Sequence, residues 1–388
     1  MRIAIFTNTY LPSVNGVVNS IVAFRRGLEA EGHVVFVFGP SVPGHADEDE
    51  CVLRSPAHTL KRYPDYPIPL PFGPRLAHRA AQLSLDLVHT QHPWLLGAWG
   101  QRFARRQRLP LVTTIHTQYE MYAHYAAPIP PALLRPALQS TVRRHCNRCH
   151  VVATPGPAMR SYLTDLGVKR PVEIVPNATD LSGFDTADGS AVRQTYAIAP
   201  DEVLYIFVGR AAKEKSLDDL VRAFVGVAAE LPRAKLMIVG GGPELERLRA
   251  LAARQTCADR ILLPGPIPYR EIATYHAAGD VFVTASVTEV QPLSLNEAMC
   301  ARTPVVGFNA GGINDMVCDG STGLLASLDE GADGLTRRML ALGRDERTRA
   351  TLAAEAHRAS LRFHIPVATQ RLLEVYDQAA TEARGEAR

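Results

Sequence analysis

The chain has 388 residues, more than a single hydrophobic core usually supports, so we expect two domains. Hydrophobic residues make up 46% and charged residues 21%, which is typical of a globular protein, and no apolar run is long enough to predict a membrane span. The net charge of +3 conceals an asymmetry: residues 1–180 carry 19 Lys/Arg against 12 Asp/Glu, a balance of +7, and residues 181–388 a balance of −4. The basic first half therefore predicts an anionic partner, either nucleic acid or lipid.

The cysteines and the first residues of the chain predict a cytoplasmic protein, and the one segment that resembles a metal site lacks a second ligand pair. The start, MRIAIFTNTYLP, lacks the long apolar core of a secretory signal, and the six cysteines follow no disulfide pattern. Segment 145–150 (HCNRCH) has the residue types of a zinc site, but no second ligand pair with suitable spacing occurs. We therefore expect no zinc there.

The first half reads as alternating strands and helices. A strand at Arg2–Phe6 runs into a turn and then a helix that starts near Gly16, where a glycine allows close approach of a ligand. Further strands are expected at 32–38, 87–89, 111–115, 151–155 and 173–176. The proline-rich segment from Ala57 to Pro74 predicts a long irregular loop. His116 directly follows a buried strand, at the edge of the sheet where ligands bind, although a lone His is often only a satisfied loop residue.

The second half repeats this architecture but not this sequence. After a strand at 203–208 comes a turn with three cations, Arg210, Lys213 and Lys215, which suits a phosphate. After the next strand, 236–239, the turn is Gly240–Gly242, and no Gly-Lys-Ser/Thr follows, so it is not a Walker loop. A strand at 261–265 comes next, and the last helix is expected at 367–383.

The stretch from Val281 to Met299 carries the strongest functional signal. An apolar strand gives way to a polar turn, and a helix begins after Pro292, with Glu289 before it and Glu297 within it. The turn lies at the carboxyl end of a parallel strand, and the new helix presents unpaired N–H groups that favour an anion. Cations and N–H groups suit a diphosphate and carboxylates suit sugar hydroxyls, so the turns together predict a nucleotide-sugar site between two doubly wound domains.

At these residues the sequence resembles the retaining glycosyltransferases of the GT-B fold, family 4. The resemblance covers nearly the whole chain and depends on short motifs around Gly209, Lys215, the glycine turn 240–243, and the Glu289/Glu297 pair. Segments 304–306, 311–313 and 319–325 complete it.

The resemblance implies an α/β chain of two Rossmann-like domains facing a central cleft. Residues 1–178, joined by a C-terminal helix 366–388, would bind the acceptor, and residues 179–365 the donor. It assigns catalytic roles to His116, Arg210, Lys215 and Glu289. It assigns donor binding to Gly16, Gly209, Arg210, Lys215, Gly241, Ile267, Glu289, Val290, Gln291, Pro292, Leu293, Ser294 and Glu297, and acceptor binding to Asn15, Tyr119 and His124.

Within the family, the segments at 9–18, 115–119 and 124–125 look most like the membrane-associated diacylglycerol glucosyltransferases. This implies a UDP-hexose donor, no metal or other cofactor, a lipid acceptor, and peripheral attachment of a cytoplasmic enzyme to an anionic membrane. Basic residues with apolar neighbours fit such attachment, although two ordinary amphipathic helices with solvated arginines explain them equally well: Arg102, Arg105, Arg106, Arg143 and Arg144.

Two alternatives remain at this stage, a third fails on sequence context, and two positions depart from the family pattern. A GDP-mannose-type or soluble-acceptor transferase shares every motif, and a basic nucleic-acid-binding protein fits the charge but lacks a recognition motif. A metal-dependent transferase using the acids at 47–49 lacks the preceding apolar strand. Ala178 stands where the family's linker has Gly, which changes the allowed backbone angles, and Pro292 removes one N–H from the donor turn.

Overall fold

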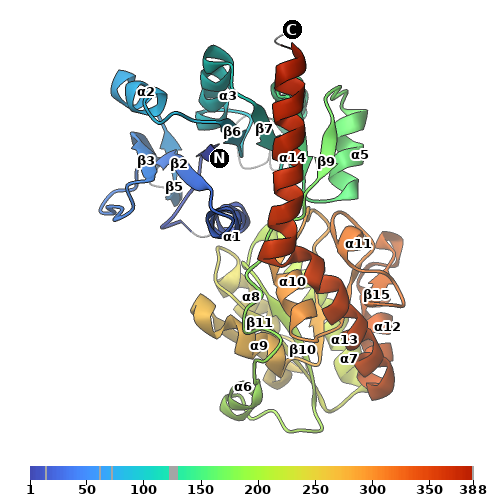
Figure 1. The fold of residues 1–388 in the computed structure, drawn as a ribbon. Helices are drawn as coiled ribbons and strands as arrows, with labels where there is room; N and C mark the ends of the chain where they lie inside the picture. Colours follow the sequence, from blue (N-terminus) through green and yellow to red (C-terminus); the bar gives the residue numbers. More distant parts are fainter. Residues whose placement is uncertain (14, 61–62, 71–72, 122–129, 387–388) are drawn as a thin grey trace. The chain divides into compact units, whose positions relative to one another are not determined.

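The computed structural model describes residues 1–388 apart from 14, 61–62, 71–72, 122–129 and 387–388 (Figure 1). The chain divides into two compact units: unit 1 is Met1–Ala178 with Ile365–Arg388, and unit 2 is Thr179–His364. Each unit has its own parallel sheet and its own hydrophobic core. None of the described helices combines the length and the apolar character needed to cross a bilayer.

A seven-stranded parallel sheet forms the centre of unit 1, in the order β3-β2-β1-β6-β7-β8-β9. Its strands are short apolar runs because helices cover both faces, and Ile3, Ala4 and Phe6 of β1 are fully buried. The strands are β1 (Arg2–Phe6), β2 (Val34–Pro40), β3 (Val52–Ser55), β6 (Leu87–Thr90), β7 (Leu111–Thr114), β8 (Val151–Thr154) and β9 (Val172–Ile174).

The helices of unit 1 include the last helix of the chain. They are α1 (Gly16–Ala30), α2 (Pro74–Ala81), α3 (Leu96–Gln107), α4 (Pro131–Cys146), α5 (Pro157–Asp165) and α14 (Ile365–Glu386). α14 packs closely on α1, since a Cβ added at Gly27 would lie 2.0 Å from Thr369 Oγ1. It also reaches the sheet, where the Tyr376 hydroxyl lies 2.8 Å from His89 Nδ1. The C-terminal helix is therefore part of the core of unit 1.

Unit 2 is built around a six-stranded parallel sheet in the order β12-β11-β10-β13-β14-β15. The strands are β10 (Val203–Val208), β11 (Ala234–Val239), β12 (Ile261–Gly265), β13 (Val281–Val283), β14 (Val305–Phe308) and β15 (Gly323–Ala326). The helices are α6 (Ser190–Thr195), α7 (Leu217–Glu230), α8 (Leu245–Ala252), α9 (Ile272–Ala278), α10 (Leu293–Cys300), α11 (Ile313–Met316), α12 (Gly331–Arg344) and α13 (Glu346–Ser360).

The strand order reverses direction once in each sheet. In unit 1 the first strand, β1, lies between β2 and β6, and in unit 2 β10 lies between β11 and β13. Parallel sheets of this kind bind ligands at the carboxyl ends of the strands beside the reversal. The predicted architecture of two doubly wound parallel sheets is confirmed.

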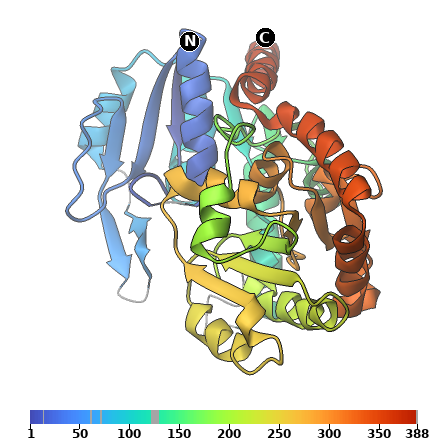
Figure 2. The same ribbon diagram turned by 90° about the horizontal axis from the view of Figure 1, so that it is seen from below.

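The prediction of an irregular loop from Ala57 to Pro74 is wrong. The segment forms an antiparallel pair, β4 (Ala57–Leu60) and β5 (Tyr63–Pro69), which lies outside the main sheet (Figure 2), and α2 begins at Pro74. A two-stranded sheet has two edges, where a proline needs no partner for its missing N–H. The prolines of this segment are therefore compatible with strands, which the proline count alone had argued against.

Ala178 ends unit 1 without the backbone freedom of a glycine. Its side chain is fully buried in the core of unit 1, and it is absent from the described residues with positive φ. On the other side of the boundary, Thr179 donates its N–H to Phe363 O at 2.9 Å, within unit 2. Alanine therefore fits the backbone at this position, and the departure from the family pattern causes no strain here.

Candidate functional site

The turns after β10 and β13 bring a cation and a carboxylate together. Lys215 ends the short 3-10 turn η2 (Lys213–Lys215) that follows β10, and Glu289 lies in the turn between β13 and α10. Their side chains form an ion pair between Lys215 Nζ and Glu289 Oε1, and both are mostly shielded from water. The pairing follows from the sheet, because β10 and β13 are neighbouring parallel strands with their carboxyl ends on the same edge.

Backbone contacts with a third turn hold Glu289 in place. Gly312, which follows β14, donates its N–H to Glu289 O at 2.6 Å, and a Cβ added at Gly312 would lie only 1.7 Å from Val290 O. From the other side, Ser286 Oγ donates to Glu214 O at 3.2 Å. Three adjacent turns are thus tied together, and the glycine at 312 is required by the close approach of the Val290 carbonyl.

The glycine turn after β11 packs on the turn that carries Arg210. A Cβ added at Gly240, where φ is +135°, would lie 1.9 Å from Gly209 O, and one added at Gly242 would lie 2.3 Å from Ala211 O. Ala211 N also donates to Gly241 O at 2.8 Å. Packing alone therefore explains why Gly240 and Gly242 are glycines, so these two residues are not by themselves a sign of a ligand.

Arg210 differs from Lys215 in having no acidic partner within the described part of the chain. It is exposed, and it directly follows Gly209 at the carboxyl end of β10. An exposed guanidinium offers five N–H donors in a planar arrangement that matches a phosphate. Of the two predicted diphosphate ligands, Arg210 is thus the more available and Lys215 is already paired with Glu289.

Glu297, on α10, is surrounded by groups that sequence reasoning did not identify. The hydroxyl of Tyr269 donates to Glu297 Oε1 at 3.0 Å, and His276 Nε2 lies 3.5 Å from Glu297 Oε2. His276 is completely buried on α9, and neither of its ring nitrogens has a hydrogen-bond partner among the described residues. Burial, and then the negative charge of Glu297, raises the pKa of Tyr269. No sequence signal links these three residues, because their separations follow no motif.

The N-terminus of α10 matches the prediction of a helix that begins after Pro292. Pro292 is the N-cap residue, with φ −71° and no side-chain cap, and the helix starts at Leu293. Proline tolerates this position because the first N–H groups of a helix have no intrahelical partner. Of the other predicted donor residues, Gln291 is buried, Ser294 is half-buried in the first turn, and Ile267 packs against the core of unit 2.

The predicted residues of unit 1 gather after β1 and β7. Asn15 is the N-cap of α1: its side chain accepts from Val18 N at 3.0 Å and donates to Thr9 Oγ1 at 3.0 Å. Gly16 follows with nothing within 4 Å of an added Cβ. Tyr119 meets Trp94 edge-on, with ring centroids 4.4 Å apart. His124 lies outside the described residues.

His116 is buried and uncharged at neutral pH. Its Nε2 lies 2.6 Å from Gln91 Oε1, and its ring also hydrogen-bonds the side chain of Asn177. Burial lowers the pKa of His116 to about 4. Such an imidazole can hold a hydroxyl by a hydrogen bond but carries no positive charge at pH 7, so it suits an uncharged sugar better than a phosphate.

The segment 145–150 is explained by packing in the sheet of unit 1. His145 Nε2 lies 3.1 Å from Thr90 Oγ1 and 3.2 Å from Thr113 Oγ1, and Gln101 Nε2 donates to Cys149 Sγ at 3.5 Å. Among the described residues no cluster of three His, Cys, Asp or Glu side chains could hold a metal ion.

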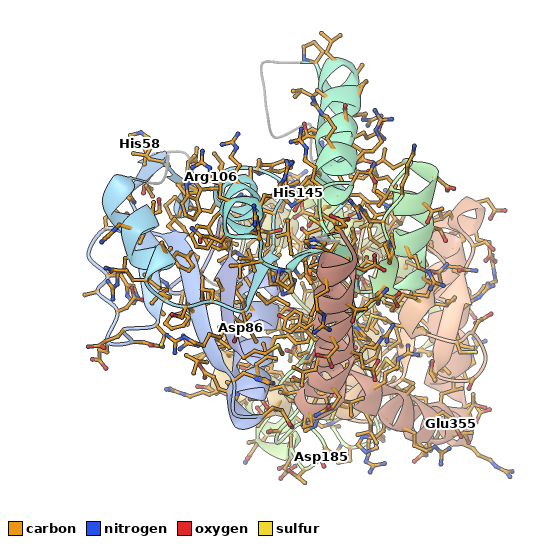
Figure 3. All side chains as sticks on the ribbon, turned by 45° about the horizontal axis from the view of Figure 1, so that its top comes forward. His58, Asp86, Arg106, His145, Asp185 and Glu355 are labelled. Atoms are coloured by element: carbon orange, nitrogen blue, oxygen red, sulfur yellow. The ribbon has the colours of Figure 1, made fainter. Side chains whose placement is uncertain are left out.

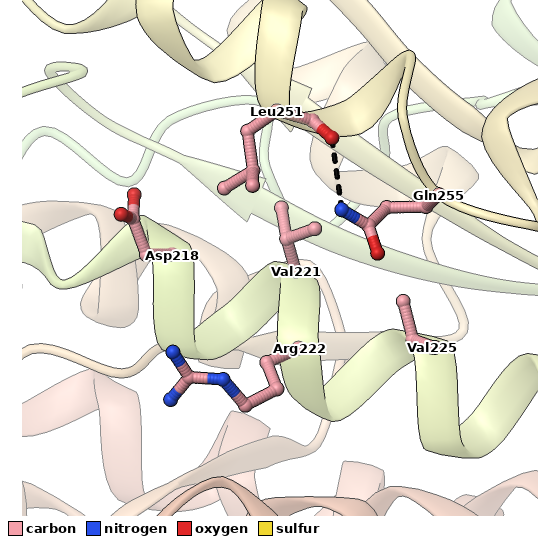
Figure 4. Close-up of a pocket in the computed structure, with 6 residues that line it drawn as sticks. All are labelled: Asp218, Val221, Arg222, Val225, Leu251 and Gln255. Carbon is pink, nitrogen blue, oxygen red and sulfur yellow. Dashed lines mark hydrogen bonds between the residues drawn. The ribbon is translucent and has the colours of Figure 1, made fainter.

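A hollow of about 160 Å³ in unit 2 has two charged lining residues, Asp218 and Arg222, and each is already in an ion pair, with Arg247 and Asp219 respectively (Figure 4). It lies between α7 and α8 and is lined by Val221, Val225 and Leu251, with Gln255 bonded to Leu251 O at 2.9 Å. Val221, Val225 and Leu251 lie on these helices and Gln255 just after α8, so none of the four is at the carboxyl end of a strand. The turn residues described above are therefore the better candidate site.

Comparison with known proteins gives matches over most of the chain. Residues 14–182 match the model "Glycosyltransferase Family 4" and residues 190–359 match "Glycosyl transferases group 1". The alpha-monoglucosyldiacylglycerol synthase of Acholeplasma laidlawii is 31% identical over 85% of this chain and 86% of its own. A GDP-mannose-dependent alpha-mannosyltransferase of Mycobacterium tuberculosis is 30% identical over 97% and 96% of the two chains. The structure of Anabaena Alr3699/HepE in complex with UDP-glucose covers 97% of this chain and 100% of its own with a TM-score of 0.75 at 18% identity, a likeness that shows the fold.

Proposed function

The chain belongs to glycosyltransferase family 4, and we propose that it moves a hexose from a UDP-linked donor to a diacylglycerol-type lipid, with retention of the donor's anomeric configuration. The family resemblance predicted from the motifs is confirmed by the two model matches, and a hexosyltransferase of the GT-B fold follows from it. The proposal concerns the donor, the acceptor and the roles of individual residues.

The observation that carries the proposal is the ion pair between Lys215 and Glu289, from adjacent turns of one sheet edge, with the exposed Arg210 in the same turn as Lys215. A diphosphate needs preorganised cations, because negative charge grows on it as the sugar leaves. A sugar needs carboxylates that accept from its hydroxyls. A nucleotide-sugar uses both kinds of group, and the start of a helix adds N–H donors for its phosphates.

In this proposal Arg210 and Lys215 bind the donor diphosphate, and Lys215 exchanges its contact with Glu289 for a phosphate oxygen. Glu289 is then available to the sugar hydroxyls, and Glu297 to the ribose. A carboxylate has about four acceptor sites, so Glu297 can keep the Tyr269 bond and still accept from a ribose hydroxyl. The N–H groups at the start of α10, from Leu293 and Ser294, complete the anion site. No resident cofactor takes part.

Neutral His116 in unit 1 holds a hydroxyl of the transferred sugar, and Asn15 and Tyr119 belong to the acceptor side. The lipid acceptor is supported by the name of the Acholeplasma laidlawii relative and by the basic balance of residues 1–180. A lipid acceptor places the enzyme at the cytoplasmic surface of a membrane, where arginines attract anionic headgroups.

One second candidate has a specific observation in its favour. The relative from Mycobacterium tuberculosis, which covers more of the chain than the lipid-glucosylating one, is named for GDP-mannose. Both candidate donors contain a diphosphate and a hexose. They differ in the nucleotide base and in which hexose is attached.

Thermal stabilisation by a panel of nucleotide-sugars tests the donor, because a ligand that binds only the folded state raises its apparent stability. We expect UDP-glucose to stabilise the protein more than GDP-mannose does. Incubation with diacylglycerol in mixed micelles should then yield an α-linked glycolipid. If only GDP-mannose stabilised the protein, the donor would be GDP-mannose and the UDP proposal would be wrong. If hexose were transferred to soluble sugars but not to diacylglycerol, the lipid acceptor would be wrong.

A further inference from the structure

A histidine in the interior of unit 2 makes no hydrogen bond with its side chain. His276, in the last turn of α9, is completely buried, and neither of its ring nitrogens is bonded within the described part of the chain. A buried polar group without a partner destabilises the folded state, and an apolar side chain of similar size would avoid this cost. Packing alone therefore does not explain why a histidine stands at this position.

Aromatic packing fixes where the ring lies. Its centroid is 5.9 Å from that of Phe184, in the loop before α6, and 5.8 Å from that of Phe282, on β13. Asp185, labelled in Figure 3, marks the loop that carries Phe184. The backbone is held as well, because Thr303 Oγ1 donates to His276 O at 3.1 Å. The imidazole is thus held in one place by groups that do not use its nitrogens.

The ring faces the carboxylate of Glu297 on α10. His276 Nε2 lies 3.5 Å from Glu297 Oε2, and the other oxygen, Oε1, accepts from the Tyr269 hydroxyl at 3.0 Å. Glu297 is only 5% exposed, and it has no Lys or Arg partner among the described residues. Because a carboxylate only accepts, the neutral imidazole that suits this contact carries its proton on Nε2. A tyrosine and a histidine therefore each face one oxygen of the same buried carboxylate.

Two donors on one carboxylate leave acceptor sites for a diol. Each carboxylate oxygen has about two acceptor sites, so one donor on each oxygen leaves one site free on each. These free sites match two neighbouring hydroxyls, such as the 2′- and 3′-hydroxyls of a ribose. A movement of about half an ångström would bring Oε2 to the usual hydrogen-bond distance from His276 Nε2. The last torsion of a glutamate is broad, so a carboxylate held by Tyr269 alone would present one oxygen as readily as two.

We propose that His276 is a positioning residue for donor binding: its Nε2–H holds Oε2 of Glu297, so that both carboxylate oxygens face the 2′- and 3′-hydroxyls of the donor's ribose. This bond gives the buried ring the partner that packing does not supply. The site then selects nucleoside diphosphates that carry a ribose over those that carry a 2′-deoxyribose. The inference rests on the proposed assignment of Glu297 to the ribose, and it names the residue that orients the carboxylate.

Thermal stabilisation by UDP and by 2′-deoxy-UDP tests this selectivity. We expect the wild-type chain to bind UDP about tenfold more tightly, as one hydrogen bond to a charged group allows. In His276→Leu the ratio should fall to about twofold, because a carboxylate that turns freely can use the 3′-hydroxyl alone. The melting temperature without nucleotide should stay the same or rise, since leucine leaves no polar group unpaired. A histidine that only supported the fold would give a lower melting temperature and an unchanged ratio.

Two amide variants separate the two ring nitrogens. Glutamine places its amide nitrogen near the position of Nε2 and asparagine near that of Nδ1, so His276→Gln should keep most of the selectivity and His276→Asn should lose it. Phe184→Leu is the matched control, because it loosens the same packing without removing a polar group. It should lower the melting temperature and leave the ratio unchanged. A tenfold ratio that persists in His276→Leu, or an equal loss of the ratio in Phe184→Leu, would overturn the proposal.

A second nucleotide pair separates failure of this inference from failure of the proposed function. UDP and GDP contain the same ribose, so GDP and 2′-deoxy-GDP extend the comparison to the second candidate donor. If the wild-type chain binds neither pair, the donor assignment and this inference are both wrong. If the wild-type chain prefers the ribose form and His276→Leu prefers it equally, only this inference is wrong and the transferase proposal stands.

Discussion

The hydroxyl of Tyr269 donates a hydrogen bond of 3.0 Å to Glu297 Oε1, although the two residues come from different segments of unit 2. Tyr269 opens the short turn that leads into α9, and Glu297 lies on α10. About half of the tyrosine is exposed, so the bond is not needed to complete a core. The bond fixes the orientation of the Glu297 carboxylate, which the family resemblance assigns to the ribose of the donor.

Removal of that hydroxyl should therefore affect donor binding and not the chemical step. In Tyr269→Phe we expect KM for the donor to rise about tenfold, which corresponds to the lower end of the net contribution of about 1.5–3 kcal/mol that a hydrogen bond to an ionised group makes. The value of kcat should stay within a factor of two, since the ribose is remote from the reacting centre. Steady-state kinetics measure both. A lower KM would mean that the hydroxyl competes with the ribose for Glu297.

Loss of either cation should reduce turnover while the protein still folds. We expect Arg210→Ala and Lys215→Ala each to lower kcat about 10²-fold or more, comparable to losing one preorganised charge-stabilising donor. Arg210 is exposed and makes no ion pair in the described structure, so its removal should leave the melting temperature unchanged. Arg222→Ala, an exposed arginine paired with Asp219 on α7, is the control and should keep full activity. Near-normal turnover in Arg210→Ala would rule out its proposed role.

Substitution of Gly16 by Ala should weaken donor binding without lowering the stability of the fold. An added Cβ meets nothing within 4 Å, and φ is not positive, so Gly16→Ala should fold with unchanged or slightly higher stability. If the donor phosphate approaches this backbone, the methyl group should weaken donor binding at least tenfold. Gly73→Ala, at the start of α2 and equally unobstructed, should leave donor binding intact. Donor titration with a thermal readout measures the effect, and equal affinity in both variants would remove Gly16 from the site.

Acidification should destabilise the protein through the buried histidines of unit 1. Burial lowers the pKa of His89 to about 3 and those of His116 and His145 to about 4, from an ordinary value of 6.5. Between pH 6.5 and about 4 the unfolded state binds more protons than the folded state, so the free energy of unfolding falls as the pH falls. Each histidine can contribute up to about 1.4 kcal/mol per pH unit.

Urea unfolding at pH 7 and pH 5 measures this effect. His89→Gln keeps hydrogen-bonding groups near Tyr376 and Thr114, and it should show a smaller loss of stability between the two pH values than the wild-type chain. His78→Gln, at an exposed position on α2, should not change the loss. A stability that is independent of pH over this range would contradict the assignment of neutral, buried imidazoles.

The strands were predictable because a parallel strand buried on both faces is a continuous apolar run. The boundaries of β1, β10 and β12 agree with those read from the sequence for this reason. The meeting of Lys215 with Glu289 was foreseeable too, since both follow strands whose carboxyl ends share one edge. The hairpin at β4 and β5 was missed because proline content does not distinguish an edge strand from a loop.

Contacts between helices were decided only by the tertiary structure. Tyr269, in the turn before α9, and His276, on α9, reach Glu297 because this segment packs beside α10, and no spacing in the sequence encodes that contact. Five arginines on α3 and α4 looked equivalent as a list, yet Arg102, Arg105 and Arg144 line a hollow of about 270 Å³ between the two helices, and Arg106 and Arg143 do not. The sequence determines which side chains each helix carries, whereas the order of the strands determines which helices are neighbours and so which faces meet.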